Sequence, residues 1–161
     1  VDPGAAPGGW NQVAAKRVGA PEYGRVVAID ILAMDPIPGV DFTSLDFFDG
    51  SAPAKVKDMI GGPADVVMSD MAANATGHAK TDHLKIMALV EAAADFAREI
   101  LAPGGSFLAK VLQGGTEAEL LASLKRDYKT VKHVKPAASR TDSAELYLLA
   151  TGFRGKSSQR P

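Results

Sequence analysis

Charged residues stand inside or at the ends of several apolar segments, and these residues are the first candidates for chemistry. Lys110 interrupts the apolar run SFLAKVL, Asp70 ends the run ADVVMSD, and Glu145 stands near the start of AELYLLAT. A lysine within a buried strand is costly unless a carboxylate pairs with it. The simpler alternatives are a lysine that reaches solvent at a sheet edge, and acids that belong to a turn and to a strand entrance.

A glycine-rich turn near the N-terminus, GAAPGG, lies between the residues VD and a predicted helix. A strand should precede such a turn, and we therefore expect the natural protein to begin upstream. A dinucleotide fingerprint requires glycine where this chain has Ala6, so that the backbone can approach a pyrophosphate. Because Ala6 is followed by Pro7, the turn is poorly suited to NAD. It could pass beneath a nucleoside without phosphates, such as that of S-adenosylmethionine (SAM).

Two further acids end predicted strands, Asp30 in RVVAID and Asp46 in VDFTSLD. In an open α/β sheet, ligands bind at the carboxyl ends of the strands, where Asp70 is also expected. Asp30 could accept hydrogen bonds from ribose hydroxyls, and Asp46 could meet the amino group of adenine. A structural turn without a ligand is the alternative.

Five stretches of the chain resemble, in the same order, the FtsJ/RrmJ (RlmE) family of RNA 2′-O-methyltransferases. DPGAAPGGWNQ is similar to the family's SAM-binding motif, normally DLGAAPGGWSQ, and VVMSDMAAN is similar to its strand end SDMAPN. The other three stretches are MDPIPGVDF, LAPGGSFLAKVLQGG and KPAASRTDSAELYLLATGF. Pro3 replaces the usual leucine and Ala73 replaces a proline, and neither change removes a reactive group.

The resemblance implies site residues by position. The family has a Lys-Asp-Lys-Glu catalytic tetrad, whose last three members correspond to Asp70, Lys110 and Glu145. The first lysine lies upstream of the SAM motif and is absent from this chain. The implied cofactor-binding residues are Gly8, Trp10, Asp30, Asp46 and Asp70. Lys110 could act as a general base, if burial and a neighbouring cation lower its pKa, or as a cation that orients the hydroxyl.

The function that the resemblance implies is SAM-dependent 2′-O-methylation of a ribose in RNA. For the bacterial branch the substrate is a uridine in the A-loop of 23S ribosomal RNA, within the large ribosomal subunit. Alternatives in the same family act on tRNA or cap RNA. An NAD-dependent oxidoreductase is disfavoured by Ala6 and Pro7. A non-catalytic ribosome-assembly factor that binds SAM and RNA is disfavoured because Asp70, Lys110 and Glu145 are all present.

The order of strand and helix signals predicts an α/β fold, with a doubly wound, mostly parallel sheet, an antiparallel edge strand and the Rossmann-like arrangement of SAM-dependent methyltransferases. The expected strands are residues 25–30, 40–46, 64–70, 106–112, 130–134 and 144–151. The expected helices are residues 10–19, 52–60, 81–101 and 117–128, with Thr81 as an N-cap. We expect one catalytic domain over residues 1–154 and a disordered tail over 155–161.

Composition limits the class of protein. The 161 residues suit a single domain, and the absence of cysteine excludes disulfides and thiolate metal sites. No apolar run reaches the roughly 20 residues of a membrane span, and no signal peptide is visible, so a cytoplasmic monomer is expected. His78, Asp82 and His83 form a small cluster, but they lie in a predicted loop and helix start, and no metal is expected.

The distribution of charge points to RNA as a partner. Residues 26–104 hold twelve acidic and five basic side chains, whereas residues 125–161 hold nine basic and three acidic ones. Six basic residues crowd one stretch, namely Lys125, Arg126, Lys129, Lys132, Lys135 and Arg140. They could form a phosphate-binding patch or a solvated basic face.

Overall fold

The computed structural model describes residues 1–71, 76–112, 116, 118–137, 142 and 145–156. Strands and helices alternate along most of the chain, as the sequence predicts. The strands are β1 Asp2–Pro3, β2 Val26–Asp30, β3 Val40–Ser44, β4 Ala64–Ser69, β5 Leu101–Leu112, β6 Tyr128–Val134 and β7 Glu145–Phe153. The helices are α1 Gly9–Val18, α2 Ala52–Ile60, α3 Ala79–Ile100 and α4 Ala118–Asp127.

The strands form two hydrogen-bonded groups, β1-β2-β3 and β4-β5-β7-β6. Val1 joins them, because its nitrogen donates to the Val66 carbonyl at 2.8 Å and its carbonyl accepts from the Met68 amide at 2.9 Å. The strand order across the molecule is therefore β3-β2-β1-β4-β5-β7-β6. The antiparallel pairs are β5–β7 and β7–β6, so β7 is the strand that runs against its neighbours. The antiparallel strand expected at the edge therefore lies one position in from the edge strand, β6.

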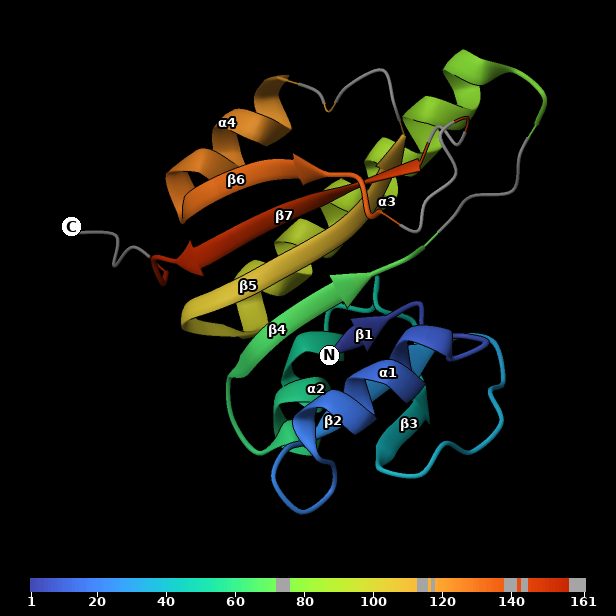
Figure 1. Ribbon diagram of the computed structural model, residues 1–161, viewed down its shortest axis with the longest axis vertical. Coiled ribbons are helices and arrows are strands. Elements are labelled where there is room, and N and C mark those ends of the chain that lie inside the picture. Colours follow the sequence, from blue (N-terminus) through green and yellow to red (C-terminus); the bar gives the residue numbers. More distant parts are fainter. Residues whose placement is uncertain (72–75, 113–115, 117, 138–141, 143–144, 157–161) are drawn as a thin grey trace.

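The helices cover the two faces of the sheet unequally. Figure 1 shows α1 in front of β1–β3, with α2 and α3 behind the strands and α4 beside β6. Behind the sheet, Phe107, Ala109 and Val111 of β5 are at most 1% exposed, in a core shared with α3 and α4. On the front of β5 and β7 no helix of the described chain is stacked, and Leu108 and Tyr147 there are only half-buried.

Glycines end the first two helices, as the sequence predicts. Gly19 follows α1 with φ 66°, and Gly61 follows α2 with φ 84°. Residues with a Cβ rarely adopt this left-handed backbone, so glycine at these positions stops each helix. The bounds of α2, Ala52–Ile60, are those expected from the sequence.

The start of α3 differs from the prediction. The helix begins at Ala79 with His78 as the N-cap residue, so the prediction of Thr81 as the N-cap is wrong. Instead, the side chain of Asp82 accepts hydrogen bonds from the backbone nitrogen and Oγ1 of Thr76, each at 2.7 Å, which holds the approach to the helix. Neither α3 nor any other helix of the described residues is long and apolar enough to cross a membrane.

Strand β5 begins at Leu101, five residues before the expected start at residue 106. Leu101 pairs with Ala64, and the register shifts before the next pair, Val66 with Ser106. A Cβ on Gly105 would lie 2.9 Å from the Ala102 carbonyl oxygen, so only glycine fits this close backbone approach. The LAPGG segment thus belongs to β5, and Leu101 is its residue paired with β4.

The predicted disordered tail is only partly within the described residues. Lys156 is described, and its Nζ lies 2.7 Å from Oε2 of Glu99 on α3. Residues 157–161 lie outside the described part of the chain.

Candidate active site

The three predicted catalytic side chains meet in one cluster. Nζ of Lys110 lies 2.8 Å from Oδ1 of Asp70 and 3.4 Å from Oε1 of Glu145. The Lys110 side chain is only 15% exposed, and β5 lies between β4 and β7, so it is not a lysine at a sheet edge. The expected pairing of this lysine with carboxylates is therefore confirmed, while the catalytic roles stay predictions.

Strand pairing brings the cluster together. Ser69 pairs with Ala109 in the parallel ladder, which puts the next residue of each strand, Asp70 and Lys110, side by side. The antiparallel strand β7 begins at Glu145, opposite Leu112 at the end of β5. The carboxyl ends of two strands and the start of a third therefore converge at one edge of the sheet, where ligands bind in such folds.

The charges of the cluster favour a protonated lysine. Burial lowers the pKa of Lys110, but the hydrogen bond and charge of Asp70, together with Glu145, raise it by more. The pKa of Lys110 is therefore above its usual value of 10.5. The amine is therefore an ammonium ion at neutral pH in this arrangement.

A cavity of about 560 Å³ opens beside this cluster, and we call it the acid-lined cavity. Its lining includes all three predicted strand-end acids and several apolar side chains, among them Asp30, Asp46, Asp70, Leu32, Phe47 and Met71. The volume lies within the usual range of about 300–1,000 Å³ for small-molecule sites. Asp70 belongs both to this cavity and to the lysine cluster.

The acids of the cavity also shape its walls. Asp30 accepts hydrogen bonds from the backbone nitrogens of Ala6, in the glycine-rich turn, and Leu32, each at 2.9 Å. Asp46 accepts one from the Phe48 nitrogen at 2.9 Å. Each carboxylate oxygen can accept a second hydrogen bond, so these contacts orient the acids without using all of their capacity.

Gly8 and Trp10, the other two predicted cofactor residues, are not among the residues that line the acid-lined cavity. Gly8 is the N-cap residue of α1 with φ 107°, and a Cβ there would lie 2.5 Å from Cδ1 of Ile37. Trp10 packs against Tyr147, with ring centroids 5.5 Å apart. Their contact with a cofactor stays a prediction.

Trp10 and Tyr147 belong to a second pocket of about 360 Å³, which we call the aromatic pocket. Its other lining residues are Leu108, Val134, Pro136 and Leu149. The pocket lies on the front face of β5, β7 and β6, the face that carries Lys110.

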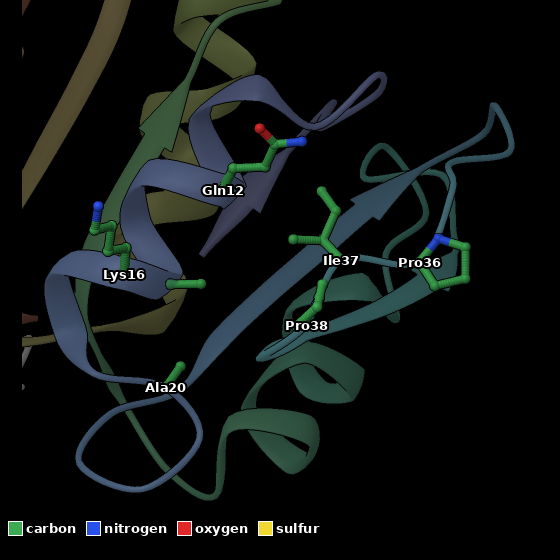
Figure 2. Close-up of a pocket in the computed structure, with 7 residues that line it drawn as sticks. Gln12, Lys16, Ala20, Pro36, Ile37 and Pro38 are labelled. Carbon is green, nitrogen blue, oxygen red and sulfur yellow. The ribbon is translucent and has the colours of Figure 1, made fainter.

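A third pocket, of about 350 Å³, lies between α1 and the segment after β2. In Figure 2, α1 contributes Gln12 and Lys16 to one wall, and the other wall holds Ile37 between Pro36 and Pro38. Its lining contains no carboxylate and no member of the lysine cluster. It is formed between α1 and the β2–β3 segment and does not match the site predicted from the sequence.

Comparison with known proteins identifies the family. The sequence profile of the FtsJ-like methyltransferases matches residues 1–153. The chain belongs to the FtsJ-like methyltransferase family. The matched region contains the glycine-rich turn, the acid-lined cavity and the lysine cluster.

Relatives of this FtsJ-like methyltransferase carry a more specific name. It is 69% identical over 156 residues to the ribosomal RNA large subunit methyltransferase E of Azorhizobium caulinodans, and 68% identical over 157 residues to that of Xanthobacter autotrophicus. The matches cover 96% and 97% of this chain, but 65% and 62% of the relatives, so the chain spans less than two thirds of their length.

A solved structure shares the fold. It is the crystal structure of a Plasmodium falciparum protein provisionally named a ribosomal RNA methyltransferase, which is 28% identical with a TM-score of 0.82. The alignment covers 96% of this FtsJ-like methyltransferase and 86% of the Plasmodium chain. The expected methyltransferase fold is thus confirmed.

Three residues near the site were missed from the sequence. Asp2 is 2% exposed and accepts a hydrogen bond from Nδ2 of Asn11 at 2.9 Å, which ties β1 to α1 across the glycine-rich turn. Burial raises the pKa of Asp2 to about 7. Tyr147 stands opposite Lys110 in the β5–β7 ladder. Its position two residues after Glu145 could have revealed it, because alternate strand residues share a face.

The histidine cluster of this FtsJ-like methyltransferase does not form a metal site. In the described ranges, no group of three or more His, Cys, Asp or Glu side chains converges as metal ligands. Asp82, the central acid of the predicted cluster, instead accepts the hydrogen bonds of Thr76.

The basic stretch divides between different surfaces. Lys125 and Arg126 lie in the last turn of α4, whereas Lys129 and Lys132 are exposed on β6. Lys129 and Lys132 are three positions apart along the strand, so they point to opposite faces. Lys132 pairs with Leu149 and shares the face of the aromatic pocket. Arg140 lies outside the described residues.

Proposed function

We propose that the chain carries the catalytic centre of a SAM-dependent methyltransferase that modifies a ribose 2′-hydroxyl in large-subunit ribosomal RNA. The observation that carries this proposal is the double position of Asp70, which lines the acid-lined cavity and pairs with Lys110 at 2.8 Å. A cofactor in the cavity would therefore lie beside the lysine cluster. Family membership and the names of the 68–69% identical relatives support the same function.

The acid-lined cavity fits the nucleoside part of SAM. In this proposal Asp30 accepts hydrogen bonds from the ribose hydroxyls, and Asp46 accepts one from the amino group of adenine. Leu32 and Phe47 supply apolar wall for the base. Three acids around one cavity would repel the phosphates of a dinucleotide, which agrees with the absence of glycine at residue 6. Gly8 and Trp10 complete the proposed cofactor set.

The chemistry needs few protein groups. When bound, SAM supplies a methyl group on a positively charged sulfur, so the electrophile is already activated. The protein must hold the ribose 2′-oxygen in line with that methyl and receive the hydroxyl proton. The raised pKa of Lys110 supports its role as a cation that orients the 2′-oxygen. Asp70 and Glu145 hold the ammonium ion of Lys110 in place. Their carboxylates are the groups beside it that can accept the hydroxyl proton.

The finer assignment is also a proposal for the whole protein. Its substrate would be a uridine in the A-loop of 23S ribosomal RNA within the large subunit, and it would act as a cytoplasmic monomer that binds neither metal nor membrane. The relatives' names support ribosomal RNA over tRNA.

The test is to map ribose methylation in RNA. Full-length protein and SAM would be incubated with large ribosomal subunits that lack the modification, and 2′-O-methyl groups mapped by primer extension at limiting nucleotide. We expect one modified uridine, with small subunits and tRNA as controls. Methylation of tRNA alone would favour the alternative that the protein is a tRNA 2′-O-methyltransferase of the same family. Binding of SAM and subunits without any methyl transfer would favour a non-catalytic assembly factor.

A further inference from the structure

The aromatic pocket adjoins the lysine cluster directly. Tyr147 in its lining is the cross-strand partner of Lys110, and Leu108 precedes Lys110 by two residues on the same face. Two residues along a strand span about 7 Å. A ligand in the pocket would therefore be within one nucleotide's reach of the Lys110 amine.

The lining of this pocket suits a flat, apolar group. Trp10 and Tyr147 present two rings, and Leu108, Val134 and Leu149 are aliphatic. The only polar side-chain atoms in the lining are the indole nitrogen and the phenol oxygen. Single-stranded RNA is held in this way, by bases that stack on aromatic side chains. With only these two hydrogen-bonding groups, the pocket would discriminate weakly between different bases.

Charge separates this pocket from the acid-lined cavity. The aromatic pocket contains no acid, and the exposed Lys132 shares its face of the sheet, two residues before Val134. The other cavity is lined by Asp30, Asp46 and Asp70, which would repel a phosphate backbone. An RNA strand would therefore approach the lysine cluster across β6 and β7, over the aromatic pocket.

We propose that the aromatic pocket holds the base of the nucleotide that is methylated. This inference rests on the proposed function, because it assumes that a ribose 2′-hydroxyl is presented to Lys110. The base must leave its stack and any pair to enter the pocket, so the RNA presents this nucleotide unpaired. Lys132 contacts a neighbouring phosphate. Selection of the target base depends on contacts outside the pocket.

Two variants alter the pocket in opposite ways. Tyr147→Leu removes a ring and keeps an apolar side chain, whereas Val134→Phe fills the space. In full-length protein, each is expected to raise the concentration of ribosomal subunits needed for half-maximal methylation roughly tenfold or more, with SAM affinity unchanged. Tyr147→Phe keeps the ring, so it is expected to need nearly the same concentration of subunits as the wild type.

The matched control is Tyr23→Leu, which removes an aromatic ring that is 93% exposed and outside the pocket. It should leave methylation unchanged. Thermal melting checks the fold of each variant. Because Val134→Phe leaves the Tyr147 side chain in place, it tests the pocket even if Tyr147→Leu unfolds. Unchanged subunit dependence in a folded Tyr147→Leu or Val134→Phe variant would overturn the inference.

A second measurement tests whether the base in the pocket is that of the methylated nucleotide. Binding of full-length protein is compared for two short single-stranded RNA oligonucleotides, one of them without a base at the target ribose. Removal of the base should weaken binding to the wild type but have little further effect on Tyr147→Leu, since both changes delete the same contact. Equal binding of the two oligonucleotides by the wild type, or independent effects of the two changes, would overturn the inference.

Failure of the inference is distinguishable from failure of the proposed function. If wild-type protein methylates subunits normally and the pocket variants behave like Tyr23→Leu, the proposed function stands and the base lies elsewhere. If the wild type transfers no methyl group to RNA, the proposed function fails, and the inference fails with it.

Discussion

Oδ1 of Asp70 lies 2.8 Å from Nζ of Lys110, and Asp70 is at the same time part of the wall of the acid-lined cavity. This one contact links the proposed cofactor site to the proposed catalytic lysine. Changes at Asp70 should therefore disturb both cofactor binding and methyl transfer. Lys110 is not among the cavity's lining residues, so changes at Lys110 should impair methyl transfer and leave cofactor binding intact.

Replacement of Lys110 by methionine tests this separation. Lys110→Met keeps a long apolar stem on β5 but removes the ammonium ion. In full-length protein we expect the rate of methyl transfer to fall about 10²-fold or more, the scale of losing one positioned acid–base group. SAM affinity, measured by calorimetry, should be nearly unchanged. Lys156→Met, on an exposed lysine paired with Glu99, is the control. A near wild-type rate in Lys110→Met would mean that Lys110 contributes only to packing and not to methyl transfer.

Arginine at the same position distinguishes the two roles of the lysine. The pKa of Lys110 is raised above 10.5, so the amine stays protonated through neutral pH. An orienting cation would be partly replaced by arginine, which is always charged. We expect Lys110→Arg to retain at least about tenfold more activity than Lys110→Met, which the same methyl-transfer assay measures. A general base predicts equal loss in both variants, and a wild-type rate that rises about tenfold per pH unit.

Asp30 should contribute to cofactor affinity. Asp30→Ala removes an acceptor for the ribose hydroxyls and two contacts to the backbone of the cavity wall. We expect calorimetry to show SAM binding weakened by about 1–3 kcal/mol. Asp41→Ala, on the exposed surface of β3, should have no effect. NAD should bind far more weakly than SAM; the reverse order would contradict the assignment of the acid-lined cavity.

Burial of Asp2 should make the stability of this 161-residue chain depend on pH. Its pKa is about 7 in the folded state against an ordinary 3.8, so between these values the folded state keeps a proton that the unfolded state has lost. The resulting stabilisation is present below about pH 4 and is lost as the pH rises to about 7. Urea unfolding should show this decline. Asp2→Asn should flatten it, because the amide does not titrate, whereas the exposed Asp41→Asn should leave it intact.

The two lysines of β6 should contribute unequally to RNA binding. Lys132 shares the face of the aromatic pocket, whereas Lys129 points to the other face and its stem lies over Gly152. In full-length protein, Lys132→Glu should weaken RNA binding and lower the slope of log affinity against log salt by about 0.7 or more. Lys129→Glu should have a smaller effect. Equal effects, or an unchanged salt slope for Lys132→Glu, would count against this path for the RNA.

The sequence by itself determined the local elements and the residues able to do chemistry. Helix α2 could be bounded correctly because glycine follows it, and Lys110 could be singled out because a charge inside an apolar strand is costly. These signals are local. Where local signals competed, the expectation was wrong. Thr81 has the side chain of an N-cap, yet α3 begins at Ala79, and Asp82 in its first turn accepts hydrogen bonds from Thr76.

Only the tertiary structure decided which side chains meet. Tyr147 faces Lys110 because β7 enters between β5 and β6 in the antiparallel sense, and a slip of one residue in that register would turn Tyr147 to the opposite face. The same register puts Tyr147 against Trp10 and creates the aromatic pocket. Pairings between strands far apart in sequence depend on packing across the whole sheet, so no local pattern in the chain could specify them.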